Sequence, residues 1–412
     1  MVTLRQLTFG SYGHTLNRRQ AISPDGDWAI YDTRNDDTHI ARTDRIEMVH
    51  IDTGNIRLVY QTPLQSEFGP GVGAAAFHPC EHKVIFIHGL SNCSPDHPYS
   101  AARRFGAIVD CDIPGRLIHA ESRRSCANPN EAFSDSVSRG GTHAHSWNQR
   151  GWISCTYNDA QSEQLAKLNP QHRDARTIGC MMPSVRPTAD LSANDSENFA
   201  GAFDFFIAAN VVQHAQSGTD QIESAVEECW LGSKPAIAFQ GAIRDQLGNL
   251  HQEIFVSDIA LTDGASPCFA QRRITHTLDR KFPGLQGPRC WLAASPDGQF
   301  IYFLARDERG TIQLFRVDSN GSAEIEQITD LACSIEGQIT LDPMGQRCSF
   351  LCDQKITIVD IPSGQVVFQS ERSTCALSGA VHFASNGRLL CNGSVDCNSN
   401  SYLQILCCQC PL

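Results

Sequence analysis

WLAASPDGQFIYFLARDERGTIQLFRVDSNGSAEIEQIT, residues 291–329, holds one complete structural unit. A short apolar run leads into Ser-Pro-Asp-Gly at 295–298, where proline presets φ and glycine accepts a positive φ, as a tight turn requires. The β-branched and aromatic residues at 300–304 are typical of a strand. Turn residues at 309–310 and 320–321 then delimit two further strands. Four short antiparallel strands in about 40 residues predict one blade of a β-propeller.

The Ser-Pro-Asp-Gly turn recurs along the chain, each time before a strand. An intact copy lies at 23–26, and altered copies lie at 78–81, 148–151, 342–345 and 384–387. The interval between the copies at 148 and 295 is too long for one blade and leaves room for another. The sequence therefore predicts an all-β fold, a single closed β-propeller over residues 1–412. Seven four-stranded blades fit best, and six or eight stay open as alternatives.

The two ends of the chain and two long segments complete the expected ring. Arg5-Gln6-Leu7-Thr8 resembles the blade-ending segment 326–329, so a strand at about 4–9 is expected to join the last blade and hide its edge. Segments 90–118 and 160–232 are expected as insertions. Within the second, residues 220–231 follow helical spacing after a capping-box arrangement and predict a short helix.

Composition restricts the class of partner. Charged residues are 19% and hydrophobic residues 41% of the chain, as in a globular protein, and the net charge of −12 disfavours a nucleic-acid partner, which needs a basic face. No apolar run reaches the roughly 18 residues of a membrane span, and residues 1–10 lack the apolar core of a secretory signal. The 18 scattered cysteines then favour buried reduced thiols and a cytoplasmic location, with no membrane partner.

The third blade breaks the repeat in its first strand, within residues 139–147. Two positions there are His143 and His145, where sister blades carry small or apolar residues: Gly73 and Ala75, Cys290 and Leu292, Gly337 and Ile339, Gly379 and Val381. Local rules are most often broken at functional sites. Side chains two apart on a strand share a face, so both imidazoles are expected to point the same way.

Topology brings further polar residues toward this pair. The Ser-Pro-Asp-Gly turns share one rim of the ring, so first strands begin and second strands end at the opposite rim. Concave sites with a few convergent polar groups are typical ligand sites. The sequence thus predicts a ligand-binding mouth formed by His88, Arg103, Arg104, His143, His145, Tyr157, Asn158 and Asp159.

The residue types in this mouth allow several chemistries. Neutral imidazoles beside a carboxylate suit a divalent metal such as Zn, Mn or Fe, which makes His88, His143 and His145 candidate metal ligands. Paired arginines suit a carboxylate or phosphate. The structural alternative is that the histidines bond to backbone and to Asp159 and join two blades. All three interpretations stay open.

Several segments together resemble a known family: 86–89, 103–104, 140–145, 156–159 and 227–232. They look like the YidR-like bacterial proteins, which are TolB-related, WD40-like propellers of unknown function. The resemblance implies a bacterial cytosolic propeller and brings no established activity. More distantly, the arrangement resembles oligogalacturonate lyases, propellers that hold a divalent metal through histidines, although that ligand pattern does not match here residue by residue.

Two functions follow from these expectations. The first is a binding propeller that takes a small anionic molecule or a peptide at one mouth of the ring. The alternative is a divalent-metal-dependent lyase or hydrolase that acts on an acidic sugar. Whether the protein is an enzyme stays open, because no pair of acid and base groups can be fixed by spacing alone.

Overall fold

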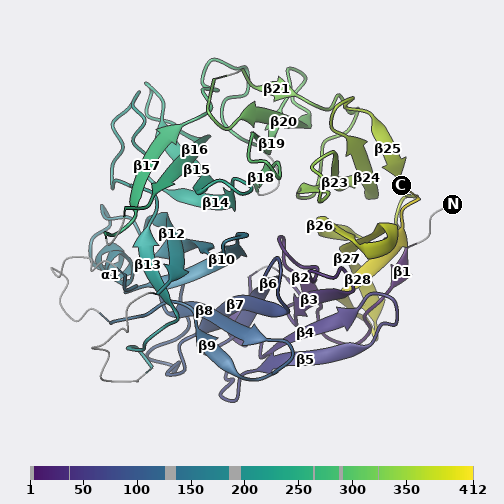
Figure 1. The fold of residues 1–412 in the computed structure, drawn as a ribbon, viewed down its shortest axis with the longest axis horizontal. Helices are drawn as coiled ribbons and strands as arrows, with labels where there is room; N and C mark the ends of the chain where they lie inside the picture. The colour runs from purple at the N-terminus through teal and green to yellow at the C-terminus, as the bar shows by residue number, and fades with distance from the viewer. Residues whose placement is uncertain are drawn as a thin grey trace.

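The computed structural model describes residues 4–36, 38–125, 136–184, 196–262, 265–286, 291–322 and 324–411. Its strands form seven four-stranded antiparallel sheets, which Figure 1 shows arranged radially as a ring. The prediction of a closed propeller with seven blades is confirmed. The core lies between neighbouring blades, because each sheet buries its two faces against the sheets beside it.

The blades follow the chain in order. The first four consist of β2 (Thr15–Leu16), β3 (Trp28–Asp32), β4 (Arg45–His50) and β5 (Ile56–Gln61); β6 (Val72–Phe77), β7 (Lys83–Gly89), β8 (Arg104–Asp110) and β9 (Leu117–His119); β10 (Gly141–Trp147), β11 (Ile153–Asn158), β12 (Arg176–Pro183) and β13 (Phe203–Ile207); and β14 (Ala225–Trp230), β15 (Ala236–Arg244), β16 (Leu250–Ala260) and β17 (Cys268–Arg273).

The last three blades complete the ring. They consist of β18 (Ala293–Ala294), β19 (Phe300–Arg306), β20 (Ile312–Asp318) and β21 (Glu326–Gln327); β22 (Thr340–Leu341), β23 (Arg347–Cys352), β24 (Lys355–Asp360) and β25 (Val366–Gln369); and β26 (Leu377–Ala384), β27 (Arg388–Cys397) and β28 (Asn400–Gln409), with β1 (Arg5–Gln6) as the fourth strand. Short 3-10 turns lie at Ile40–Arg42 and Ser385–Gly387.

The N-terminal segment lies along the last blade. β1 pairs antiparallel with β28, with Arg5 opposite Cys407. Beyond the strand, the Leu7 amide donates to the Ile405 carbonyl at 2.8 Å and the Thr8 hydroxyl to the Gln404 side chain at 3.0 Å. Strands from both terminal regions therefore belong to one sheet, and Figure 1 shows β1 beside β28 at its edge.

Hydrogen bonds explain why the Ser-Pro-Asp-Gly sequence makes a turn. The Ser295 hydroxyl donates to Asp297 at 2.5 Å and accepts from the Phe300 amide at 2.9 Å. Gly298 has a φ of 69°, in the left-handed region that glycine accepts most readily. The same bonds recur from Ser23 to Asp25 and Trp28. A short motif thus joins first and second strands in distant blades.

The helix predicted at 220–231 is wrong. Residues Ala225–Trp230 form β14, the inner strand of the fourth blade, and pair with β15. The physical reason is a bulge: Glu227 has a φ of 58° and the register shifts between Val226 and Cys229. The bulge interrupts the alternation of buried and exposed residues, so the apolar spacing imitates a helix.

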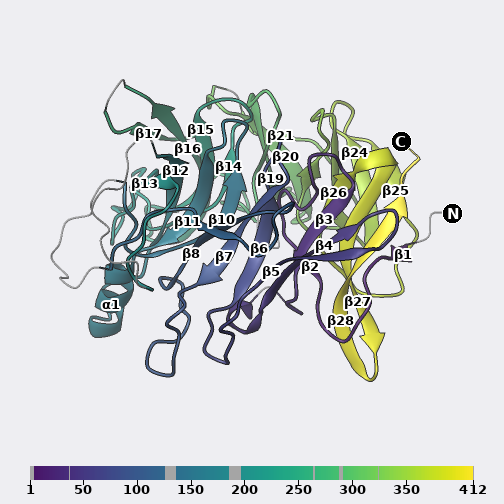
Figure 2. The same ribbon diagram turned by 60° about the horizontal axis from the view of Figure 1, so that its bottom comes forward.

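The one α-helix in the described residues lies elsewhere. α1 (Ala160–Leu168) follows β11, and Figure 2 shows it projecting from the same side of the ring as the tip of the β27–β28 hairpin. The segments 90–118 and 160–232, expected as insertions, contain the strands β8 and β9 and the strands β12 to β14 of regular blades. Among the helices that the structure describes, none has the length and apolar character needed to cross a membrane.

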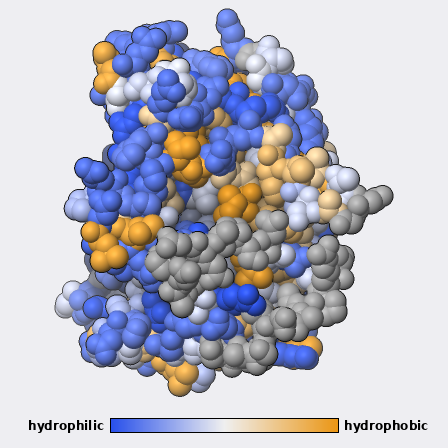
Figure 3. Space-filling view, turned by 90° about the vertical axis from the view of Figure 1, so that its left-hand side faces the viewer, coloured by the Kyte–Doolittle hydropathy of each residue, from blue (hydrophilic) through white to orange (hydrophobic). Residues whose placement is uncertain are grey.

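The side of the ring formed by the third and fourth blades is chemically mixed. Figure 3 shows hydrophobic residues near the middle of this side, between hydrophilic ones. Apolar side chains from these two blades include Ile207 at the end of β13, Val211 and Val212 in the segment that follows it, and Phe269 of β17. They line a cavity of about 410 Å³.

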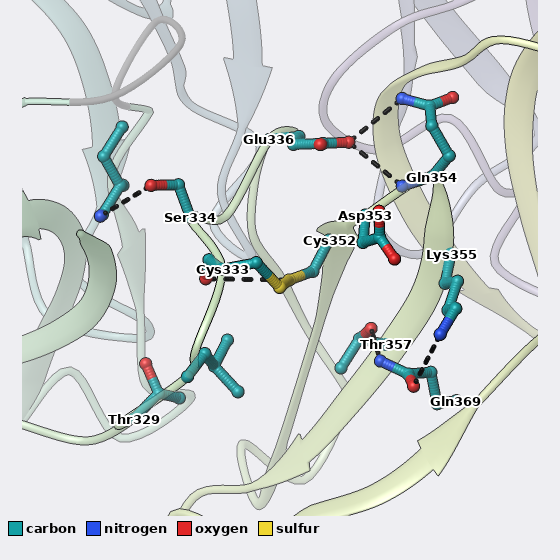
Figure 4. The surroundings of a disulfide bond; sticks show 12 residues. Thr329, Cys333, Ser334, Glu336, Cys352, Asp353, Gln354, Lys355, Thr357 and Gln369 are labelled. Carbon is teal, nitrogen blue, oxygen red and sulfur yellow. Dashed lines mark hydrogen bonds between the residues drawn. A yellow bond between two sulfur atoms is a disulfide. The ribbon is translucent and has the colours of Figure 1, made fainter. Parts of the chain in front are cut away.

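One pair of cysteines differs from the expectation of reduced thiols. Cys333, in the connection after β21, forms a disulfide with Cys352 at the end of β23 (Figure 4). The fold brings their Cα atoms to 6.7 Å, within the range that a disulfide spans. The other cysteines that the structure describes are free, and most of them are buried. The bridge ties the connection between the fifth and sixth blades to a central strand.

Candidate functional site

The first strand of the third blade, β10, carries both histidines of the broken repeat. Gly140 and Gly141 let this strand begin close to neighbouring backbone, because a Cβ at either position would lie 2.0 Å from a carbonyl oxygen, that of Asn158 or of Ala101. Ala144 then has a φ of 56°, and the register with β11 shifts between His143 and Ser146. β10 is therefore a bulged strand.

The same bulge occurs in the two neighbouring blades. Ala74 of β6 has a φ of 55° and Glu227 of β14 a φ of 58°, and each lies within a register shift. The inner strands of three successive blades thus each contain a bulge at the equivalent position. Such bulges re-aim side chains and are common beside functional sites.

The bulge separates His143 from His145. His143 lines a cavity at the mouth of the central channel, whereas His145 is 1% exposed and lies at the junction with the second blade, 3.0 Å from the place of a Cβ on Gly106. The prediction that both imidazoles share a face is wrong, because that rule holds for an uninterrupted strand and Ala144 interrupts this one.

The channel cavity has a volume of about 270 Å³ and receives residues from five blades. Its apolar wall includes Ile87, Val226 and the indole of Trp291. Its polar lining is rich in positive charge and consists of Asn17, Arg18, Arg34, Thr38, Tyr99, Arg104, His143, Thr156, Arg176 and Glu227. In a chain of net charge −12, four guanidinium groups thus meet one carboxylate in the described lining.

The arginines differ in how their charge is balanced. Arg34 forms two hydrogen bonds with Asp32, at 2.7 and 2.8 Å, and Asp32 also accepts from the amide of Ala74 at 2.7 Å. Arg104 is 7% exposed and donates from Nη1 to the Tyr99 hydroxyl at 3.2 Å. Within the described part of the chain its Nε is buried without a hydrogen-bond partner, and no carboxylate forms an ion pair with it. Arg104 is therefore a buried cation open to an anionic ligand.

His143 contributes a neutral imidazole to the cavity. Burial lowers its pKa well below the usual value, and the nearby charges of Arg104 and Arg176 lower it further. Its Nδ1 is buried without a hydrogen-bond partner among the described residues. The indole Nε1 of Trp291 is likewise buried without a hydrogen-bond partner among the described residues. Buried polar atoms of this kind are rare unless water or a ligand bonds to them.

His145 belongs to a hydrogen-bond chain that joins two blades. Its Nε2 lies 2.9 Å from the Thr142 hydroxyl, which donates to Glu121 at 2.7 Å. Burial lowers the pKa of His145 to about 3 and raises that of Glu121. In the fourth blade, Glu228 takes the position of His145 after the bulge, and it accepts from Thr156 at 3.0 Å. These groups match the structural alternative rather than a ligand site.

His88 lies in a different cavity from His143. Its Nδ1 donates to the Gly89 carbonyl at 2.5 Å, so Nε2 accepts from the Tyr60 hydroxyl at 3.0 Å. Alternation along two strands explains the separation: Ile87 and Arg104 line the channel cavity, whereas His88 and Phe105 line a pocket beside the first blade. Burial lowers the pKa of His88 to about 4.

The remaining predicted residues lie outside the channel cavity. Arg103 pairs with Glu197 at 2.5 Å, and buried Asn158 donates to Asp174 at 3.4 Å. Asp159 caps α1 by accepting from the amides of Gln161 and Ser162 and forms an ion pair with Arg139 at 2.6 Å. Tyr157 donates to Asp159 at 3.3 Å, and both line the cavity of 410 Å³ on the side of the ring.

No metal-ligand cluster assembles from the predicted residues. In the described ranges, no group of three or more His, Cys, Asp or Glu side chains is placed to hold a metal ion. His88, His143 and His145 lie in the pocket beside the first blade, in the channel and at a blade junction, respectively. The structure thus brings Arg104 and His143 together in the channel cavity and places the other six predicted residues elsewhere.

Sequence reasoning missed most of the cavity wall. Arg18 and Trp291 lie beside the inner strands of the first and fifth blades, where an alignment of inner strands could have found them. The sequence did not indicate Glu227, because the apolar spacing of its strand resembles that of a helix. Arg176 begins β12 in a stretch expected to be an insertion, and Arg34 follows β3 without a motif.

The class that the fold and the cavity define is a seven-bladed β-propeller with a polar, arginine-lined channel mouth. A family model described as "Protein of unknown function (DUF3748)" matches residues 71–194, which include β6 to β12. The chain is also 28% identical over 409 residues to "Uncharacterized protein YidR" of Escherichia coli (strain K12), with 94% of each chain covered. The resemblance to the YidR-like proteins is therefore confirmed over nearly the whole chain.

Solved structures agree on the fold. An oligogalacturonate lyase from Vibrio parahaemolyticus overlaps with a TM-score of 0.54 at 10% sequence identity, covering 100% of this chain and 94% of the lyase. A protein described as "putative TolB" from Agrobacterium tumefaciens gives a TM-score of 0.41 at 17% identity, with 79% of this chain and 88% of that chain covered, and this overlap is too low to support an argument. At such identities the likeness concerns the propeller fold and carries no activity to this chain.

Proposed function

We propose that this propeller binds a small anionic molecule in the channel cavity, with Arg104 as the main charge partner of the ligand. The observation that carries the proposal is the convergence of four guanidinium groups on one cavity in an acidic chain. Arg34 already has Asp32 as its counter-ion, but Arg104 has no carboxylate partner among the described residues. A buried cation is costly unless an anion pairs with it.

The cavity fits a small ligand with one to three acidic groups. A guanidinium donates two parallel hydrogen bonds to a carboxylate or phosphate. His143 is neutral, so its buried Nδ1 can accept a hydrogen bond from a hydroxyl group of the same ligand. Trp291 offers a flat apolar wall, held by the guanidinium groups of Arg18 and Arg19 at 5.0 and 4.8 Å from its ring centre. A volume of about 270 Å³ suits a small molecule better than a peptide.

Binding is the function that this geometry supports best. A lyase or hydrolase that depends on a divalent metal would need a ligand set, and the described residues offer none. Neutral His143 beside buried arginines suits recognition of an anion that carries a hydroxyl group. We therefore propose a binding protein and leave the metal-dependent alternative without a supporting observation.

Calorimetric titration with citrate and with inorganic phosphate tests this proposal. The wild-type protein should bind at least one of them saturably, and Arg104→Gln should weaken binding by about tenfold or more, because a buried charge-assisted bond is lost. Arg103→Gln is the matched control, because Arg103 is next to Arg104 in the sequence but its guanidinium pairs with Glu197 outside the cavity. Equal affinity of wild type and Arg104→Gln, or failure of wild type to bind any small anion, would contradict the proposal.

A further inference from the structure

The pocket that His88 lines, between the first and second blades, lies away from the channel. Its volume is about 660 Å³, within the range of small-molecule sites. Tyr60 of β5 forms the wall from the first blade, whereas His88, Phe105 and His119 come from three strands of the second. Phe199, from the segment before β13, completes the wall. Neither the channel proposal nor the predicted metal set accounts for this pocket.

The wall contains a series of aromatic rings that contact one another. The ring of Tyr60 meets His88 edge-on at 5.5 Å, and His88 stacks on Phe105 at 5.1 Å. Phe105 contacts His119 at 4.7 Å, and His119 stacks on Phe199 at 4.0 Å. Flat rings in stacked and edge-to-face contact favour a planar aromatic ligand, because aromatic pairs stabilise beyond the area they bury.

The pocket carries no charged side chain in its described lining. Its two histidines are neutral near pH 7, since burial lowers the pKa of His88 to about 4 and also lowers that of His119. This is the opposite of the channel cavity, where four arginines gather. A charged ligand would lose its hydration in this pocket without gaining an ion pair.

His119 offers a polar group of the wall to a ligand. Both nitrogens of His88 are used, by the Gly89 carbonyl and by the Tyr60 hydroxyl. The ring of His119 lines the pocket, and within the described residues its side chain makes no hydrogen bond. A neutral imidazole can accept from a hydroxyl group or donate to it.

We infer that this pocket, which we call the blade 2 pocket, is a second binding site that takes an uncharged aromatic molecule bearing a hydroxyl group, with its ring on Phe105 and Phe199 and its hydroxyl at His119. The site is independent of the channel cavity. β7 and β8 separate the two, because alternate residues of these strands face different cavities.

Titration with p-cresol, followed by calorimetry, tests the inference. Saturable binding with one site per chain is expected, and p-toluate, which replaces the hydroxyl by a carboxylate on the same ring, should bind at least about tenfold more weakly. Failure of p-cresol to bind saturably would overturn the inference. Tighter binding of p-toluate than of p-cresol would overturn the assignment of an uncharged ligand.

Two tryptophan variants locate the binding. Ala200 is exposed and lines the pocket, so Ala200→Trp should obstruct it and abolish p-cresol binding without disturbing the core. Ala265 is an exposed alanine in the connection between β16 and β17, far along the ring, and Ala265→Trp should leave binding unchanged. Unchanged binding in folded Ala200→Trp would overturn the location.

A third variant tests the role of His119. His119→Leu should bring the affinity for p-cresol down to that for toluene, because the hydroxyl loses its partner. Retention of the wild-type preference for p-cresol over toluene would overturn that role. Binding of citrate to the channel should be unaffected in all three variants, so failure of either site can be distinguished.

Discussion

His143 and His145 are two residues apart on one strand, yet their rings lie in different environments. Ala144 between them has a φ of 56°, and this left-handed residue directs His143 to the channel cavity and His145 to the junction of two blades. His143 thus lines the cavity proposed for a ligand, whereas His145 is bonded to Thr142. The bulge decides which member of the His-x-His pair faces that cavity.

The bulge itself can be tested by substitution at Ala144. Glycine adopts a positive φ without strain, so Ala144→Gly should keep the free energy of unfolding or raise it by up to about 1 kcal/mol. Valine is β-branched, and Ala144→Val should lower it by more than about 1 kcal/mol. Urea denaturation measures both. Ala270→Gly is the control, because Ala270 is exposed on a regular strand and its replacement should cost about 0.5–1 kcal/mol.

A loss of stability in Ala144→Gly as large as that in Ala270→Gly would contradict a strained left-handed residue at Ala144.

Acid should destabilise the protein through its buried histidines. A histidine in the unfolded chain titrates near 6.5, whereas burial lowers the pKa of His145 to about 3 and those of His14 and His382 to about 4. Between these values the unfolded chain binds a proton that the folded chain does not. Stability is therefore fully present above about pH 6.5 and falls on acidification, by up to about 1.4 kcal/mol per pH unit for each histidine.

Glu228 has the opposite effect on the pH dependence of stability, because burial raises its pKa to about 7. Its contribution to the free energy of unfolding is therefore lost as the pH rises toward that value. Urea denaturation at pH 7.5 and pH 5.5 should show a shallower dependence for His145→Leu than for wild type. His39→Leu is the control, since His39 is exposed. The same slope in wild type and His145→Leu would mean that His145 does not titrate abnormally.

Closure of the ring predicts a specific effect of truncation. Deletion of residues 1–10 removes β1 together with buried Leu7 and Thr8, and it exposes the edge of β28. We expect a lower melting temperature or aggregation, measured by scanning calorimetry and light scattering. Leu7→Ala should show a smaller loss of about 2–4 kcal/mol without aggregation, because β1 stays in place. An unchanged melting temperature after deletion would mean that the N-terminal segment does not stabilise the ring.

The propeller could be predicted because its turns are local chemistry. Ser295 and Asp297 form their hydrogen bonds within one short motif, so the motif forms the same turn wherever it recurs. The fourth blade could not be assigned, because Glu227 breaks the strand alternation and leaves an apolar spacing that resembles a helix. A bulge depends on packing with neighbouring strands, which the local sequence does not encode.

The candidate site could be predicted in part. The rim was chosen from topology, and Arg104 and His143 do meet there. His88 was misplaced because one residue of shift along β7 moves a side chain to another face. Arg18 and Arg176 come from blades far apart in the sequence, and their convergence depends on the closure of the ring.

The position of a bound anion measures the proposed site most directly. Crystals grown with selenate, whose selenium scatters anomalously, should show an anomalous peak in the channel cavity within hydrogen-bond distance of the Arg104 guanidinium and next to His143. Excess citrate should remove this peak, and crystals of Arg104→Gln should lack it. An empty channel cavity in crystals that hold selenate elsewhere would contradict the proposed function.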